Sequence, residues 1–446
     1  MNSASPELKR SLGIFDGIGL LVGITIGAGI YSTPQIIAAY LSSYGTIMLL
    51  WIGVALFVYV GSLIYAELGS RFPETGGEYV YILKAFGPFW GFLFGWAQLF
   101  IIRTSPAAGL SLVTANYIGF FIELNRTEKI IIALSVIALF GALNVAGVNK
   151  ASFYNKVSSA VKISGLAILG VVGMLLLNGN GDFLSQASHP TATLGPIGNV
   201  IAALMLVLFS YIGWDRVGYV AGEMKNPRKV IPLSMFLGMG IIIALYLLMN
   251  TLYHATLGME GMRGSTIVAS NSAVKIFGSV GAAVVSLLVI VSATGSINGT
   301  IMSASRVYYA MARDGLLFKW LDYIHPSFQT PTRAIFAHCV WGAVILIVRG
   351  TFETIVAGMV FAILIFYTFT TVALFKFRKE GAGSKDAYEI PGFPVVPGLY
   401  LVGIIVLICL RGYYEWGKSV QDLAFVLTGI PVYFVWFRPK IENGRH

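Results

Sequence analysis

Gly23-Ile24-Thr25-Ile26-Gly27-Ala28-Gly29-Ile30 interrupts the first long apolar segment of the chain, which runs from Leu12 to about residue 40. A second apolar segment, from about residue 197 to 221, contains Phe209-Ser210-Tyr211-Ile212-Gly213-Trp214-Asp215 at a matching place in the second half. Backbone that leaves the helix inside a bilayer has unpaired N–H and C=O groups, which only protein or a water-filled cavity can satisfy. Two interrupted helices in corresponding positions therefore indicate a binding site.

The composition defines the class of protein. Of the 446 residues, 57% are hydrophobic and 11% are charged, whereas about 25% of the residues of a soluble domain carry charge. We therefore predict an all-α polytopic membrane protein, and the apolar runs of roughly 18 to 25 residues predict about twelve transmembrane helices. The predicted spans lie near residues 13–39, 45–69, 86–120, 129–147, 154–178, 197–222, 232–257, 273–311, 332–349, 352–376, 397–412 and 421–437.

Positive charges are distributed unevenly between the predicted loops. With an even number of spans, 19 of the 30 Lys and Arg residues fall on the side that holds both termini, and 7 fall on the other side. The positive-inside rule then predicts a multi-pass protein of the plasma (inner) membrane whose termini, residues 1–12 and 438–446, are cytoplasmic. The net charge of +10 follows from this bias, so nucleic acid is not an expected partner.

Several other chemistries lack their usual residue patterns. Cys339 and Cys409 both fall inside apolar spans, and nothing has the spacing of a metal site. The chain has no phosphate-binding Gly-rich loop followed by Lys and Ser or Thr. No cluster of His, Cys or carboxylates occurs in the spans. We therefore expect no metal, no cofactor and no enzymatic activity, and we expect any energy input to come from gradients rather than from ATP.

The first interruption has the features of a carboxylate site. A break at Gly27-Ala28-Gly29 frees the N–H groups that open the following half-helix, and such groups favour an anion. Small residues also let a ligand approach the backbone closely. The alternative is a helix-packing face of small residues, which Gly19, Gly23 and Gly27 also satisfy at a spacing of four.

The second interruption supplies the complementary chemistry. Carbonyl groups that end the half-helix before residues 209–215 can accept hydrogen bonds from an ammonium group. Phe209 and Trp214 offer apolar walls that exclude water, although a tryptophan such as Trp214, taken separately, is more often a packing residue than a gate. A carboxylate site opposite an ammonium site describes a site for a zwitterion, such as an amino acid.

Further motifs carry a family resemblance. Residues 27–31 (GAGIY), 65–81 (YAELGSRFPETGGEYVY) and 222–227 (GEMKNP) resemble the amino acid/polyamine/organocation superfamily. Within it, the chain is similar to the L-amino acid transporter family over about residues 10–380, and it looks like a bacterial neutral amino acid exchanger. The motifs that carry this second resemblance are residues 115–117 (ANY), 209–214, 296–300 (SINGT), 305–306 and 312–315 (ARDG).

The resemblance implies the leucine-transporter fold. Five helices would be repeated in inverted orientation, with residues 13–178 and 197–376 as the repeats, discontinuous helices 1 and 6, and two extra helices at 397–437. The ligand would lie between spans 1, 3, 6 and 8. Alternating access would rock spans 1, 2, 6 and 7 against spans 3, 4, 8 and 9.

The resemblance also assigns roles to single residues. The amides of Gly27, Ala28 and Gly29 would bind the substrate carboxylate, and the carbonyl groups of Ile24 and Phe209 would bind its amino group. The ring of Phe209 would close over the ligand as an outer gate. Ile212 replaces the small residue often found at its position, which favours small or medium neutral substrates. The remaining predicted substrate-binding residues are Ser210 and Asn298.

Lys162 is a charged residue inside the fifth span, where an ammonium group needs polar partners. A lysine at the matching place in the family resembles an occupant of the sodium position of sodium-coupled relatives, where it bridges the first and fifth helices. This interpretation predicts a coupling role and sodium independence. In the alternative interpretation, Lys162 extends to the cytoplasmic interface, because Lys156 lies only six residues before it.

Asp215, beside the second interruption, is a further intramembrane charge. It could bind a cationic substrate, carry a proton or pair with Arg216 or Arg103, and we favour an ion pair with a structural or gating role. Trp214 is predicted to act in the same gate. Near the inner surface, other charged residues could form gate contacts, but we expect most of them to be solvated. These residues are Glu67, Glu74, Glu78, Arg306 and Arg313.

The sequence thus predicts a secondary-active amino acid transporter that works by sodium-independent exchange. Proton-coupled symport, exchange of cationic amino acids or polyamines, and a membrane amino acid sensor remain alternatives. Eukaryotic members of the family bind a glycoprotein through a cysteine after the third span. Residues 120–129 contain no cysteine, so we expect no disulfide-linked accessory subunit and a single chain that functions alone in the lipid bilayer.

Overall fold

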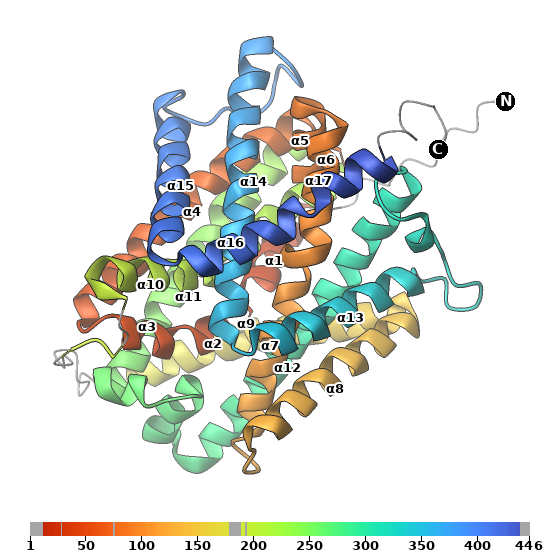
Figure 1. The fold of residues 1–446 in the computed structure, drawn as a ribbon. Helices are drawn as coiled ribbons and strands as arrows, with labels where there is room; N and C mark the ends of the chain where they lie inside the picture. Colours follow the sequence, from red (N-terminus) through yellow and green to blue (C-terminus); the bar gives the residue numbers. More distant parts are fainter. Residues whose placement is uncertain (1–11, 28, 75, 178–188, 192–193, 438–446) are drawn as a thin grey trace.

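The computed structural model describes residues 12–27, 29–74, 76–177, 189–191 and 194–437. Within these ranges it is built from helices without a β-strand (Figure 1). Eleven helical segments of the described chain are long and apolar enough to cross a membrane. The prediction of an all-α polytopic protein is confirmed, and the chain is an integral multi-pass membrane protein.

The helices of the first half extend to Leu177. In chain order they are α1 (Ile14–Thr25), α2 (Gly29–Ser32), α3 (Pro34–Tyr40), α4 (Tyr44–Arg71), α5 (Glu78–Phe86), α6 (Pro88–Ala97), the π-helix η1 (Gln98–Ile102), α7 (Thr104–Ile118), α8 (Arg126–Val145) and α9 (Val148–Leu177).

The helices of the second half begin after residue 194. They are α10 (Gly195–Tyr211), the 3₁₀-helix η2 (Trp214–Glu223), α11 (Pro227–Arg263), α12 (Val268–Arg313), η3 (Lys319–Leu321), α13 (Thr332–Arg349), α14 (Phe352–Glu380), α15 (Val395–Tyr414), α16 (Trp416–Leu427), α17 (Gly429–Val432) and η4 (Tyr433–Phe437).

Both predicted interruptions are present. The first helix ends at Thr25 and resumes at Gly29, and the sixth ends at Tyr211 and resumes at Trp214. Thr33 lies between α2 and α3, and its N–H donates to the carbonyl of Gly29 at 2.8 Å. The helical hydrogen-bond pattern therefore continues from α2 into α3. The prediction of discontinuous helices 1 and 6 is therefore confirmed.

The third predicted span, 86–120, is not one regular helix. It consists of α6, the π-helix η1 and α7, and Arg103 forms the junction between η1 and α7. A π-helical turn adds a residue to the helix and is frequent at functional sites. This segmentation accounts for eleven continuous candidate spans where the sequence predicted about twelve.

Two helices are longer than their predicted spans of 232–257 and 273–311. Helix α11 continues past Gly258 and α12 begins before Gly278, and both glycines have positive φ values, of 63° and 71°. Glycine adopts this backbone conformation without strain. The additional helical turns therefore lie at an angle to the rest of α11 and α12.

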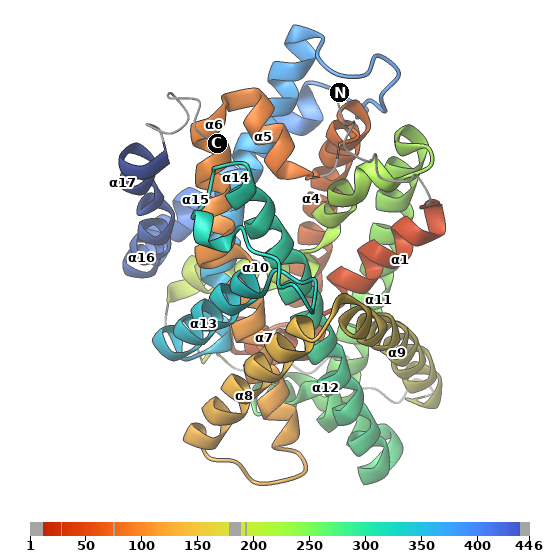
Figure 2. The ribbon, with the colours of Figure 1, turned by 90° about the vertical axis from the view of Figure 1, so that its right-hand side faces the viewer.

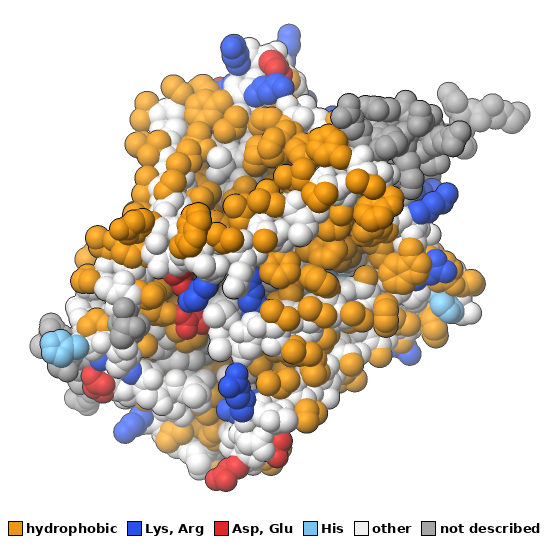
Figure 3. Space-filling view, viewed as in Figure 1, with side chains coloured by type: hydrophobic (Ala, Val, Ile, Leu, Met, Phe, Trp, Pro, Cys, Tyr) orange, Lys and Arg blue, Asp and Glu red, His pale blue; other side chains and the backbone are white. Residues whose placement is uncertain are grey.

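The interior is formed by α1, α4, α7, α10, α11, α12 and α14, with α8 and α9 packed outside (Figures 1 and 2). Helix α11 lies beside α4 and α1, and α12 lies between α7 and α9. Large apolar side chains face outward from the peripheral helices, for example Leu139, Leu175 and Leu399. Hydrophobic side chains also cover much of the face in Figure 3. Such a surface is compatible with lipid rather than water.

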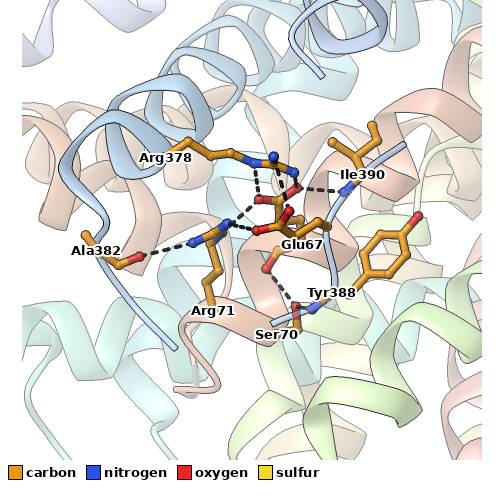
Figure 4. A network of polar contacts seen from close by, with 8 residues as sticks. Glu67, Ser70, Arg71, Arg378, Ala382, Tyr388 and Ile390 are labelled. Atoms are coloured by element: carbon orange, nitrogen blue, oxygen red, sulfur yellow. Dashed lines mark hydrogen bonds and ion pairs between the residues drawn. The ribbon is translucent and has the colours of Figure 1, made fainter. Parts of the chain in front are cut away.

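One end of the helix assembly is tied together by a buried charge cluster (Figure 4). Glu67 of α4 accepts hydrogen bonds from Nε and Nη2 of Arg378 of α14 at 2.7 Å, and from Nε of Arg71 at 2.8 Å. The N–H of Ile390 donates to the same carboxylate at 2.8 Å, and Glu389 contacts both arginines. The cluster therefore fixes the loop after α14 against the end of α4.

The Glu67→Gln variant is expected to lower thermal stability. Glutamine removes the negative charge and turns an N–H₂ donor toward guanidinium donors, and breaking a buried ion pair costs about 3 kcal/mol. Glu74→Gln is the matched control, because the Glu74–Lys84 pair is exposed and contributes little. Thermal unfolding in detergent should show a lower melting temperature for Glu67→Gln alone, and equal melting temperatures would contradict this role.

Candidate functional site

The two interruptions touch one another. A Cβ placed on Gly29 would lie 2.9 Å from Cα of Ser210, and one on Gly213 would lie 2.8 Å from Oγ1 of Thr25. Gly213 also has φ of +132°, a value that side chains disfavour. The close approach of the two broken helices therefore depends on glycine on both sides.

A single hydroxyl group joins both breaks. Tyr246 of α11 is fully buried, and its Oη lies 2.9 Å from the carbonyl oxygen of Thr25 and 2.9 Å from that of Ser210. These carbonyls belong to the last turns of α1 and α10, where helical partners are missing. The single hydroxyl hydrogen is shared between one carbonyl group of each half-helix and holds the two breaks together.

The first break is also held from the other side. Tyr117 of α7 donates its hydroxyl to the carbonyl of Tyr31 at 2.8 Å, and the Thr33 and Ser210 hydroxyl groups lie 2.9 Å apart. Gly27 N–H donates to Thr25 C=O at 2.8 Å in this conformation. The residues that resume the first helix are thus anchored to α7 and α10.

Phe209 closes one side of the breaks. The residue is 9% exposed, and its ring packs edge-to-face on Phe352, with centroids 5.5 Å apart. Beyond this contact lies a cavity of about 40 Å³, lined in part by Gln35, Asn116 and Phe352. This volume holds only a few water molecules. The packed rings of Phe209 and Phe352 therefore separate the breaks from this cavity.

Lys162 lies inside the protein. Only 2% of its surface is exposed, and Nζ lies 3.4 Å from Oγ of Ser296 on α12. The same Oγ would be 3.5 Å from a Cβ on Gly27. The alternative in which Lys162 extends to the surface is wrong for this conformation. The side chain of Ser296 lies between the ammonium group of Lys162 and the first break.

The charged side of the second break is buried as well. Trp214 packs against Tyr65 and Tyr367, with ring centroids 4.8 and 5.3 Å apart, and Asp215 is 1% exposed. Nε of Arg216 lies 3.5 Å from Oδ2 of Asp215, so the predicted Asp215–Arg216 pair is present.

Arg103, the other predicted partner, has a separate set of contacts. It donates through Nε to Gln98 at 2.7 Å, and it lies over the ring of Tyr219 at 4.9 Å from the centroid. The π-helix η1 places this guanidinium group at the junction with α7, where the sequence predicted a regular helix.

Three residues predicted to bind substrate make contacts within the protein or lie at its surface. The side-chain amide of Asn298 is engaged by Asn144 at 2.9 Å and by the carbonyl of Ala151 at 2.8 Å, so it joins α12 to α8 and α9. Ile24 lies in the last turn of α1 with a half-exposed side chain, and Ile212 N–H donates to the Phe209 carbonyl at 3.1 Å. Ala28 lies outside the described residues.

Of the five charged residues near the predicted inner surface, three are exposed as expected. These are Glu74, Arg306 and Arg313. Glu67 and Glu78 are instead buried, because α14 and the loop after it cover the end of α4. Tyr246 and Tyr117 carried no sequence signal beyond a polar hydroxyl group in an apolar span, which needs a partner when buried.

The Gly29→Ala variant should impair the contact between the breaks. Its methyl group would meet the backbone of Ser210, and overpacking of this kind costs roughly 1–3 kcal/mol. We expect a fall of roughly tenfold or more in amino acid uptake by proteoliposomes. Gly19→Ala, in the same predicted span, meets nothing within 4 Å and serves as the control. Equal loss in both variants would contradict the contact as the cause.

The chain is similar to a family of known proteins over nearly its whole length. The amino acid permease model matches residues 12–436. The serine/threonine exchanger SteT of Bacillus subtilis (strain 168) is 29% identical over 97% of this chain and 98% of its own length. The human b(0,+)-type amino acid transporter 1 and the human cystine/glutamate transporter are each 28% identical, over 97% and 98% of this chain and 89% of their own lengths.

These matches confirm the resemblance predicted from the two breaks and the motifs around them. The relatives are transporters and exchangers of amino acids by their names, and the similarity covers 97–98% of this chain. The chain belongs to the amino acid permease family, within the amino acid/polyamine/organocation superfamily.

Proposed function

We propose that this protein exchanges small or medium neutral L-amino acids across the membrane. The observation that carries the proposal is the junction of the two broken helices, held by Tyr246 and closed on one side by Phe209. Amide groups of the first break and carbonyl groups of the second provide complementary partners for a carboxylate and an ammonium group. The names of the relatives, which include a serine/threonine exchanger, point to the same activity.

A neutral side chain suits the charges around the breaks. Asp215 is buried and already pairs with Arg216, its neighbour in the chain. A cationic substrate would need an unpaired carboxylate in the site. Exchange of cationic amino acids or polyamines is therefore the less favoured alternative.

Lys162 supports sodium independence. A buried ammonium group beside Ser296 and the first break supplies a fixed positive charge where a bound cation would otherwise be needed. In this proposal the charge holds α9 and α12 against the break throughout the cycle. No cation then has to enter or leave with the substrate.

We propose that residues 13–178 and 197–376 are inverted repeats that alternate access to the site. Helix pairs that would correspond in the two repeats lie side by side in the interior, namely α4 with α11 and α7 with α12. The bundle of spans 1, 2, 6 and 7 would rock against spans 3, 4, 8 and 9. The chain would work without a disulfide-linked subunit.

We propose that both termini lie in the cytoplasm. The first described residue, Leu12, accepts a hydrogen bond from Lys225 N–H at 2.9 Å, and Arg228 pairs with Asp386 at 2.6 Å. Together with the Glu67 cluster, these contacts gather several Lys- and Arg-bearing loops at one end of the molecule. The positive-inside rule assigns that end to the cytoplasm.

The proposal is tested by uptake of radiolabelled L-serine and L-alanine into proteoliposomes in sodium-free buffer without a pH gradient. We expect uptake that requires an internal neutral amino acid and that is unchanged when sodium is added. Uptake into empty vesicles that depends on a sodium or proton gradient would show symport. Competition only by arginine, lysine or polyamines would show a cationic substrate, and ligand binding without flux would identify a sensor.

A further inference from the structure

Glu78 is a carboxyl group buried in protein between the second break and the proposed cytoplasmic face. It is the first residue of α5 and is 1% exposed. Gly77, with φ of +54°, directs it inward, and a Cβ on Gly77 would lie 2.9 Å from the ring of Tyr219. The loop before α5 is therefore pressed against η2, and Glu78 enters the interior at this contact.

The hydrogen bonding of Glu78 is incomplete for a carboxylate. Oε1 accepts the hydroxyl of Tyr65 on α4 at 2.7 Å and that of Thr370 on α14 at 3.2 Å. Among the described residues, Oε2 has no hydrogen-bond partner. An ionised carboxylate with one unpaired buried oxygen is costly, whereas a protonated carboxyl group carries no charge there.

Aromatic rings and a second acid surround the carboxyl group. Tyr65 packs on Trp214, Tyr81 and Tyr367, which keeps bulk water away from this region. The titratable and charged groups that face Glu78 come from every neighbouring element. They are Tyr65 (α4), Tyr81 (α5), Arg103 (the end of η1), Tyr219 and Asp215 with its partner Arg216 (η2), Tyr367 (α14) and Tyr400 (α15).

These surroundings favour the neutral carboxyl group. Burial, and second the negative charge of Asp215, raise the pKa of Glu78 from the ordinary 4.5 to about 8. The hydrogen bonds from Tyr65 and Thr370 and the charge of Arg103 oppose this rise only in part. Glu78 therefore keeps its proton at neutral pH while α4, η2 and α14 stay packed around it.

We propose that Glu78 is a proton-binding site whose occupancy holds the cytoplasmic side of the transporter closed. The carboxyl group joins α4 and η2, which belong to the proposed moving bundle, to α14, which does not. Opening toward the cytoplasm would hydrate Glu78 and release its proton, and closing would take the proton up again from the same side. The cycle then moves no net proton across the membrane.

The direction of the pH effect follows from the two pKa values. The closed form holds the proton up to about pH 8, whereas a hydrated carboxyl group loses it near 4.5. Between these values, each unit of rising pH disfavours closing by up to about tenfold. Above about pH 8 the group is ionised in both forms and the dependence ends.

Infrared titration of the purified protein tests proton binding without transport. We expect a C=O stretch of a protonated carboxylic acid that persists above pH 6, where ordinary carboxyl groups are ionised, and that is absent from Glu78→Gln. The Thr370→Val variant removes a donor to the ionised form, so the pH at which this band disappears should rise. No band specific to Glu78, or an unshifted titration in Thr370→Val, would overturn the proton site.

Amino acid exchange, measured at equal pH inside and outside the vesicles, tests whether proton binding by Glu78 controls closing. This part of the proposal rests on the proposed exchange activity. We expect the wild-type rate to fall by about tenfold or more as pH rises toward about 8 and then to level off. Glu78→Gln should give a flat profile, and the exposed Glu74→Gln should behave as wild type. A flat wild-type profile, or an unchanged fall in Glu78→Gln, would overturn the coupling while leaving amino acid exchange itself intact.

Discussion

Replacing Tyr246 with phenylalanine is expected to reduce amino acid exchange by roughly tenfold to a hundredfold while the protein still folds. The variant keeps the ring, which packs against Trp51 and Tyr211, and removes only the hydroxyl group. The buried Ser210 carbonyl then loses its donor and the Thr25 carbonyl keeps only the N–H of Gly27, and an unsatisfied buried acceptor costs about 1–3 kcal/mol. The half-helices α1 and α10 would no longer be held at a fixed separation.

Tyr253→Phe is the matched control for this prediction. Tyr253 lies on the same helix and is equally buried, but its hydroxyl has no hydrogen-bond partner in the described part of the chain. Initial rates of L-serine exchange in proteoliposomes, compared at equal amounts of reconstituted protein, measure both variants. Similar rates in Tyr246→Phe and Tyr253→Phe would show that the shared hydroxyl is not needed.

Replacing Lys162 with alanine should reduce exchange to the background of protein-free vesicles. The ammonium group is the buried charge beside Ser296 and the first break, and no mobile cation replaces it in a sodium-independent cycle. Lys156→Ala, six residues earlier on the exposed face of α9, should keep nearly the wild-type rate. Uptake in sodium-free and sodium-containing buffers measures both variants.

Adding sodium separates two roles that Lys162 could have. If Lys162→Ala regains uptake when sodium is added, the lysine acts as a substitute for the cation. If its uptake stays at background in both buffers, the charge has a positional role that sodium does not replace. Uptake equal to wild type in sodium-free buffer would contradict a role of Lys162 in coupling.

The membrane architecture could be predicted from the sequence because the bilayer imposes it. Apolar runs of fixed length predicted the spans, including the short ones that became α13 and α15. The breaks at residues 25–29 and 211–214 were also predictable, since Gly23, Gly27 and Gly29 interrupt the first apolar run and Gly213 lies at a matching place in the second, and glycine weakens a helix.

The internal contacts of the site could not be predicted in the same way. No residue pattern in η1 distinguishes this π-helix from an α-helix, so the position of Arg103 could not be predicted. Tyr246 is one tyrosine in an apolar run, and its two acceptors come from residues far away in the sequence. Glu78 lies in a polar loop sequence, and only the packing of η2 and α14 over that loop buries it.

Efflux of radiolabelled L-serine from preloaded proteoliposomes tests the central claim, that the joined breaks form an exchange site. The vesicles are diluted into sodium-free buffer at equal internal and external pH, either without amino acid or with L-alanine. We predict rapid loss of label only when external L-alanine is present. Loss of label at the same rate into amino acid-free buffer would contradict obligatory exchange.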